Sequence, residues 1–301
     1  MNVADSAREL YVFARVLDYL GITLFVGGCL FVALLWPNGG NDPRTRRLLA
    51  IGWFLGLAGT LAAIAFQAAW VTQQPINLAA LQQLLSVQVG RVWFAKALLW
   101  VLAMVVLADL LQRREKAARS AAWRVGAGAV ALGLLRTAGL TGHAVDAPDK
   151  TVAEIAALAH LAGVCAWFGG LVFLLLGVLP RRQPDELATV TPKYSRLAMI
   201  SVIVIASAGT VLALQLLPSL DVLVTTGYGR LLLIKLAVFA VILGAAQLSK
   251  RWVKRRLDFA VVLRGDSATV RPFVYSVAVE TVLVVAVLVA ASLLVTANPG
   301  R

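Results

Sequence analysis

The sequence has few of the side chains that usually carry out enzyme chemistry. Of its 301 residues only two are His and two are Cys, and 14% are charged, where soluble domains average about a quarter. We find no nucleophile placed beside a base, no glycine loop suited to phosphate and no third histidine. Hydrolytic catalysis is therefore not expected, and we do not predict an enzyme.

The two cysteines offer no cross-link. Cys29 and Cys165 fall within long apolar stretches at different depths, and a disulfide requires α carbons within about 7 Å of each other. Each is expected to be a small buried apolar residue.

Hydrophobic residues make up 60% of the chain, and the mean hydropathy is +0.84. Long apolar stretches must cross a bilayer as helices, because backbone amides find no water in lipid. The sequence thus predicts an all-α, polytopic membrane protein with eight transmembrane helices and a short interfacial helix at 78–89. The stretches are 11–36, 48–72, 91–111, 122–141, 153–179, 197–217, 229–249 and 272–296.

Basic residues predict the orientation in the membrane. The loops at 37–47, 112–124, 181–196 and 250–271 hold 19 of the 28 basic residues, and such loops face the cytoplasm. Both termini, and the loop between the histidines, should then lie on the extracytoplasmic side of the membrane. The basic clusters suit contact with membrane lipid, and they lack the aromatics or folded module of a nucleic-acid site.

The chain reads as a duplication. Because each half contains an even number of crossings, the halves should be parallel repeats within one membrane domain, 1–148 and 149–301. Asp18, Gly21, Phe25, Gly27 and Gly28 have the same spacing as His160, Gly163, Trp167, Gly169 and Gly170. Two shorter motifs also recur. Gly59-Thr60 corresponds to Gly209-Thr210, and Gly90-Arg91 with Lys96 corresponds to Gly229-Arg230 with Lys235.

Several polar residues fall inside the predicted spans. Asp18 and His160 share helix stripes with glycines, so both should face the bundle as symmetry mates. Asp18 is expected to pair with Arg15 or with Arg136, in either a structural or a functional role.

Three more charged residues lie within the spans. Lys96 and Lys235 need partners or water at their depth. Glu280, deep in the last span, is either a proton or cation station or part of an interhelical ion pair.

The histidines point to metal chemistry, because imidazole is a common transition-metal ligand. His143 ends its helix at the surface, whereas His160 lies roughly 10 Å deeper by helical rise. They cannot share one ion unless the loop dips inward. Successive stations are the alternative, with Asp146 and Asp149 attracting cations to the loop.

A set of motifs in this sequence resembles the copper resistance protein D family of bacterial inner-membrane proteins. The motifs are Gly142-His143-Ala144, His160 with Trp167-Phe168-Gly169-Gly170, Gly229-Arg230 with Lys235, and Glu280. The likeness is strong over 139–296. It implies copper transport or homeostasis with a periplasmic or other extracytoplasmic copper-binding partner. By the same likeness His143 and His160 are the metal-ligand candidates, Trp167 packs around them, and Glu280 is a polar position of unknown role.

The chain departs from the pattern expected for copper in one respect. Cuprous ion prefers soft thioether and thiolate ligands, yet there are only three methionines, and no methionine ladder crosses the bilayer. Two alternatives therefore stay open. The histidines could ligate haem b, with the glycines making room for the porphyrin, or they could hydrogen-bond across helices in a membrane scaffold or assembly factor that binds no metal.

Overall fold

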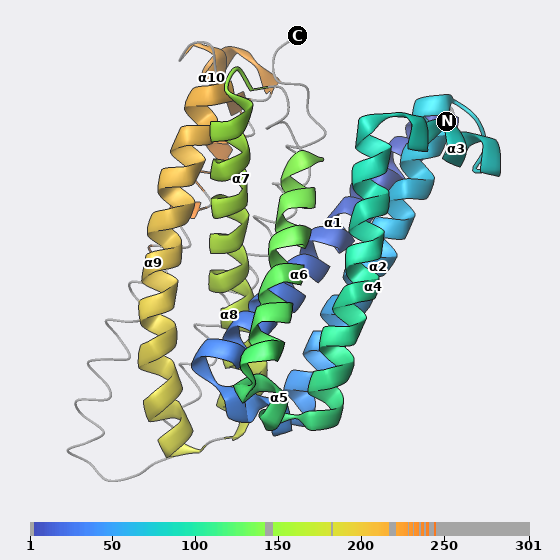
Figure 1. Cartoon of the computed structure of the whole chain (residues 1–301). Helices are drawn as coiled ribbons and strands as arrows, with labels where there is room; N and C mark the ends of the chain where they lie inside the picture. Colours follow the sequence, from blue (N-terminus) through green and yellow to red (C-terminus); the bar gives the residue numbers. More distant parts are fainter. Residues whose placement is uncertain are drawn as a thin grey trace.

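The computed structural model describes residues 3–141, 147–181, 183–216 and 221–227, and then 229, 230, 232–234, 236, 237, 239, 240 and 244. Throughout these residues the regular structure is helical, as predicted (Figure 1). The α-helices are α1 Val3–Leu30, α2 Pro43–Thr72, α3 Leu78–Ser86, α4 Gln88–Arg113, α5 Glu115–Arg119, α6 Ala121–Leu140, α7 Lys150–Val164, α8 Gly170–Phe173, α9 Pro184–Leu216 and α10 Val222–Thr225.

Tighter and wider turns interrupt these helices. The π-helical turns are η1 Phe31–Leu35, η4 Cys165–Gly169 and η5 Leu174–Val178, and the 3₁₀ turns are η2 Pro37–Asn41 and η6 Leu179–Arg181. A π turn followed by a 3₁₀ turn thus ends both α1 and the helix that continues from α7. π turns inside helices often mark functional positions.

Five helices of the described residues are long and apolar enough to cross a membrane: Ala7–Leu35, Pro43–Thr72, Gln88–Arg113, Lys150–Arg181 and Asp185–Gln215. The chain is a multi-pass membrane protein. Helix α6 coincides with the predicted fourth stretch and packs against α4. The seventh and eighth predicted spans lie wholly or largely outside the described residues, so the full set of eight stays a prediction.

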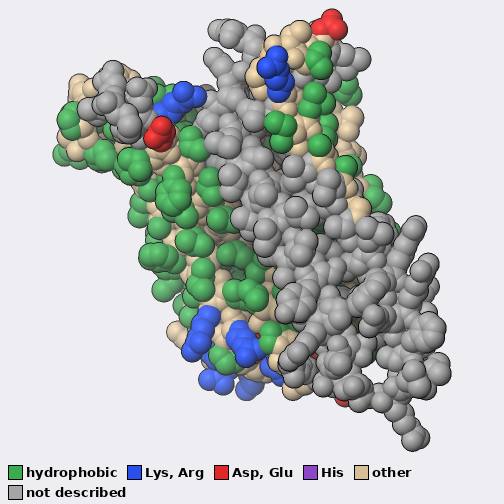
Figure 2. Space-filling model, turned by 180° about the vertical axis from the view of Figure 1, so that it is seen from behind, with side chains coloured by type: hydrophobic (Ala, Val, Ile, Leu, Met, Phe, Trp, Pro, Cys, Tyr) green, Lys and Arg blue, Asp and Glu red, His purple; other side chains and the backbone are tan. Residues whose placement is uncertain are grey.

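The outer surface suits lipid contact. On α4 Leu98, Val101 and Val105 are each more than half exposed, and so is Ile203 on α9. Figure 2 shows apolar side chains spread over the middle of one face, with Lys and Arg gathered at its lower end. Apolar surface on this scale would be unusual for a soluble monomer.

The short helix expected at 78–89 forms as α3. Asn77 caps its N-terminus, where the Asn77 side-chain oxygen accepts a hydrogen bond from the Ala80 amide at 2.8 Å. Ala80 and Leu84 are buried against the neighbouring helices. This prediction of a helix is confirmed.

Helix α1 lies at the centre of the described bundle. It packs against α2 along a glycine seam, where a Cβ added to Gly21 would come within 2.1 Å of the Gly56 nitrogen. Gly52, Gly56 and Gly59 continue the seam on α2. Small residues let membrane helices approach closely. The contact of Gly21 with α2 confirms the prediction that the glycine stripe of α1 faces the bundle.

A second close crossing joins α1 to η4. A Cβ on Gly27 would lie 2.3 Å from the Cys165 carbonyl oxygen, and one on Gly169 would lie 2.4 Å from the Thr23 carbonyl oxygen. Residues 23 and 27 are the sequence equivalents of 165 and 169, so the contact is reciprocal. Reciprocal contacts are typical of equivalent surfaces that meet at a two-fold axis.

Candidate functional site

The first polar site lies between α1, α2 and α4. The Lys96 ammonium on α4 donates to Oδ2 of Asp18 on α1 at 2.5 Å, and both side chains are almost fully buried. The Thr60 hydroxyl on α2 donates to the other carboxylate oxygen at 3.0 Å. Three helices are therefore held together by one buried carboxylate.

Arg15 lies beside this pair, one helical turn earlier on α1, and is 1% exposed. It donates to the hydroxyls of Tyr11 at 3.1 Å and Tyr19 at 2.7 Å, and to the Thr141 carbonyl oxygen at 2.8 Å. The last bond connects α1 to the end of α6, two residues before His143. Arg15 thus anchors the helix that leads into the loop between the histidines.

The aromatic ring of Trp93 links the two cations. The Arg15 guanidinium carbon lies 5.6 Å from the Trp93 centroid, and the Lys96 nitrogen lies 4.6 Å from it. The cluster holds two formal positive charges and one carboxylate. A ring face stabilises cations most where water is excluded, which offsets part of the excess charge.

The predicted partners of Asp18 are wrong. Arg15 donates to tyrosine hydroxyls and a carbonyl, as described above. Arg136 is 63% exposed and pairs with Glu154 on α7 at 2.6 Å. Asp18 points from α1 toward α2 and α4, and Lys96 reaches it there. The prediction that Lys96 needs a partner is confirmed.

The second polar site lies between α7 and α9. Nδ1 of the half-buried His160 is 3.0 Å from the Ile205 carbonyl oxygen. A carbonyl only accepts hydrogen bonds, so Nδ1 carries the hydrogen, and a neutral ring then has its lone pair on Nε2. Metal-binding histidines are commonly held in this way, with one ring nitrogen donating to a backbone carbonyl.

The glycine equivalences noted in the sequence place the two sites in similar surroundings. A Cβ on Gly59 would lie 2.4 Å from the Asp18 nitrogen. A Cβ on Gly209 would lie 3.4 Å from both Cε1 and Nδ1 of His160. In each half a glycine of the following long helix therefore faces the polar residue. The first half holds an ion pair at this position, and the second half holds an imidazole.

Trp167 packs next to the His160 site. It belongs to a buried cluster with Phe168, Val172 and Ile205, whose carbonyl faces His160. Its own carbonyl accepts a hydrogen bond from the Tyr194 hydroxyl at 2.9 Å. Its ring meets Phe239 edge-on at 5.8 Å. Trp167 thus stiffens the wall of the site.

The remaining predicted site residues, His143, Lys235 and Glu280, lie outside the described residues. Within the part of the chain that the structure describes, no three His, Cys, Asp or Glu side chains gather in a group that could hold a metal ion. Cys165 is buried and its sulfur faces the Ile22 carbonyl on α1, whereas His160 faces α9. The two residues therefore contact different helices.

Sequence reasoning missed five residues that contact these polar side chains: Thr60, Trp93, Ile205, Tyr11 and Tyr19. Only Thr60 could have been singled out from the sequence, because it belongs to the Gly-Thr pair that both halves contain. The others depend on which helices become neighbours, and the local sequence does not encode that.

Comparison with known families decides the relationship of this chain. Residues 4–149 match the family described as copper resistance protein D-like, N-terminal domain. Residues 188–294 match copper resistance protein D. The chain belongs to the copper resistance protein D family. The resemblance drawn from the histidine and glycine motifs is confirmed, and it extends to the first half of the chain.

One curated relative has a related name. The copper transport protein CutJ of Bacillus subtilis (strain 168) is 30% identical over 290 residues, which cover 89% of this chain and 51% of that protein. The chain therefore spans about half the length of this relative. No solved structure matches this chain significantly. The family and the helices together support a copper-related membrane protein.

Proposed function

We propose that this protein transports copper across the bacterial inner membrane, or maintains copper homeostasis there, and that histidines capture the ion at the extracytoplasmic face. Family membership supports the cargo, and the name of the relative supports transport. The rest of the proposal depends on residues of this chain.

The observation that carries the proposal is the setting of His160. Its Nδ1 donates to the Ile205 carbonyl, which fixes the tautomer and the ring plane, as in many metal-binding histidines. Gly209 faces the ring, and Trp167 belongs to the same buried cluster as Ile205. The imidazole is therefore oriented before any ion arrives, which lowers the cost of binding.

His143 would be the entry station of this route. His160 lies about 15 Å along α7 from Lys150, at ~1.5 Å per residue, so the two histidines would act in succession. Arg15 holds the end of α6 through Thr141, and Arg136 ties α6 to α7 through Glu154. Both contacts fix the helices on either side of the loop to which an extracytoplasmic copper-binding partner would deliver the ion.

The parallel repeat belongs to the same proposal. The reciprocal crossing of Gly27 and Gly169 supports it, as do the π turns that end both first helices. In Figure 1 α1 and α7 also run in the same direction. The basic loops support an orientation with both termini outside.

Metal analysis of the full-length protein in detergent tests the function. After loading with copper and removal of excess, His160→Ala and His143→Ala should each retain less copper than the unmodified chain. Gln67→Ala, at a buried polar position of α2, is the matched control and should retain the full amount. Equal copper in all variants would reject histidine capture, and a Soret band in the purified protein would instead indicate haem.

A further inference from the structure

A pocket opens where α1, α6 and α9 meet at one end of the bundle. It has a volume of about 510 Å³ and is lined by residues 33–38, by two arginines near the start of α6 and by the first turns of α9. Pockets for small ligands commonly have volumes of about 300–1,000 Å³. The apolar span of α1 ends at Leu35 and that of α9 begins at Asp185, so the pocket lies at the boundary between lipid and water.

The break in α1 creates this pocket. After the π turn η1, Trp36 leaves the helical conformation, with φ −143° and ψ 72°. A 3₁₀ turn follows, in which Gly40 lies so close to Arg114 that a Cβ would come within 2.8 Å of its carbonyl carbon. The chain therefore turns sideways before α2 begins, and the space that a continued helix would fill stays open.

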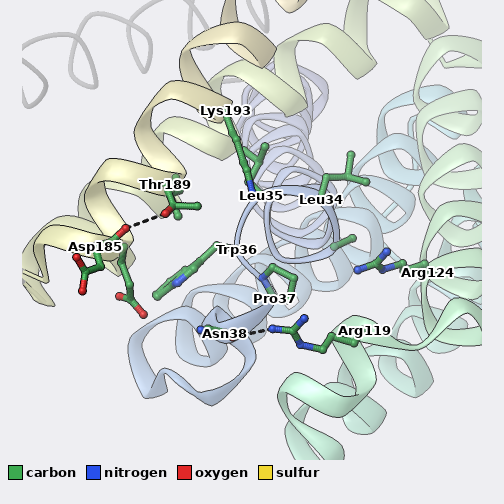
Figure 3. Close-up of a pocket in the computed structure, with 13 residues that line it drawn as sticks. Leu34, Leu35, Trp36, Pro37, Asn38, Arg119, Arg124, Asp185, Thr189 and Lys193 are labelled. Atoms are coloured by element: carbon green, nitrogen blue, oxygen red, sulfur yellow. Dashed lines mark hydrogen bonds between the residues drawn. The ribbon is translucent and has the colours of Figure 1, made fainter.

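Cationic side chains lie on two sides of the pocket. Figure 3 shows Lys193 reaching in from α9, with Arg119 and Arg124 on the opposite side. Arg124 is held by a 2.9 Å hydrogen bond from Nε to the Ala118 carbonyl, and Arg119 by Asn38 and Glu115. These bonds fix the two guanidinium groups beside the pocket, an arrangement suited to a phosphate.

The acidic wall of the pocket is formed by Asp185 and Glu186 at the start of α9. Glu186 faces Arg181 at 3.0 Å, whereas Asp185 is exposed at the rim. An occupant with only negative charge would be repelled here. An occupant that carries an ammonium group beside its phosphate would place its anionic group against the basic side chains and its cationic group against the acidic wall.

Most of the remaining lining is apolar. Leu34 is 59% exposed, whereas Leu35 and Val190 are buried. The pocket therefore offers a place for a cation, an anion and an apolar chain together.

We propose that this pocket binds the headgroup of a zwitterionic aminophospholipid, phosphatidylethanolamine. The phosphate lies between Lys193, Arg124 and Arg119, the ammonium group lies near Asp185, and an acyl chain follows Leu34 into the bilayer. A bound lipid would connect α1, α6 and α9 at the point where α1 breaks.

Thermal stability of the full-length protein in detergent, measured with added lipid, tests the proposal. Phosphatidylethanolamine should raise the melting temperature more than phosphatidylglycerol or phosphatidylcholine does. Lys193→Gln and Arg124→Gln should each weaken the lipid's effect by about tenfold in half-saturating concentration, the equivalent of ~1.4 kcal/mol. Arg113→Gln, at the same end but paired with Asp109 on its own helix, should leave the effect unchanged.

Asp185→Asn separates the zwitterionic headgroup from a purely anionic one. It should reduce the effect of phosphatidylethanolamine and increase that of phosphatidylglycerol, because the acidic wall no longer favours the ammonium group. Equal stabilisation by all three lipids, a preference for phosphatidylglycerol in the unmodified chain, or an equal effect of soluble phosphoethanolamine would each overturn the proposal. None of these outcomes depends on copper.

Discussion

Lys96 and Asp18 form an ion pair 78 positions apart in sequence, with 2.5 Å between nitrogen and oxygen and neither side chain more than 1% exposed. Arg15 lies close by, so the buried cluster holds one more cation than anions. Removing either partner leaves a charge in a medium that solvates it poorly. The consequences for stability differ between the two residues.

Asp18→Asn should destabilise the protein more than Lys96→Met. The first change leaves Lys96 and Arg15 without a carboxylate, whereas the second leaves Arg15 and Asp18 as one cation and one anion. Breaking a buried pair typically costs ~3–5 kcal/mol. Thermal unfolding in detergent, followed by circular dichroism, measures the difference.

The exposed ion pair of Arg136 with Glu154 provides the control for the two buried-charge variants. Arg136→Ala removes an ion pair whose arginine is 63% exposed, and such pairs contribute only ~0–1 kcal/mol. A loss of stability in Arg136→Ala as large as that in Asp18→Asn would contradict the importance of burial.

Gly27→Ala and Gly169→Ala should each destabilise the fold. The new methyl group would meet backbone atoms at 2.3 Å and 2.4 Å, which side-chain rotation cannot relieve, and overpacking typically costs ~1–3 kcal/mol. Gly126→Ala and Gly128→Ala on α6 are matched controls, because a Cβ there has no atom within 4 Å. Unfolding midpoints of the four variants test this crossing, and four equal midpoints would refute it.

Gly209→Val should weaken copper binding although every histidine remains. A Cβ already approaches the His160 ring at 3.4 Å, and the branched side chain would push the ring away from the Ile205 carbonyl. Gly209→Ala should be tolerated, since 3.4 Å is close to ordinary contact. Ser207→Ala, exposed on the same helix, is the control. Copper titration with a competing chelator compares them, and unchanged affinity in Gly209→Val would argue against a preoriented imidazole.

Single cysteines should report the orientation. Lys150 and Lys116 are both exposed at opposite ends of the helices, whereas native Cys29 and Cys165 are buried. A thiol reagent that cannot cross the inner membrane should label Lys150→Cys in intact cells and should label Lys116→Cys only after the membrane is opened. The reverse pattern would place the loop between the histidines in the cytosol.

The sequence predicted the helical class because hydropathy alone determines which segments can leave water. It also predicted that the stripes of Gly21 and Gly163 face neighbouring helices, and both do: Gly21 packs on Gly56, and Gly163 packs on Ile205 and the Ser201 carbonyl. Spacing along a single helix was enough for these predictions.

Pairing between helices could not be predicted in this way. The predicted partner of Asp18 was wrong because the actual partner, Lys96, depends on how α4 lies against α1. The hydrogen bond from His160 to Ile205 was missed for a related reason, since any backbone carbonyl can accept and the sequence does not distinguish one from another.

X-ray absorption spectroscopy of the copper-loaded, full-length protein tests the central claim most directly. The account predicts imidazole scattering from His160 around the copper, and its loss in His160→Ala with Gln67→Ala unchanged. A spectrum with sulfur ligands alone, or one identical in His160→Ala and the unmodified protein, would contradict it.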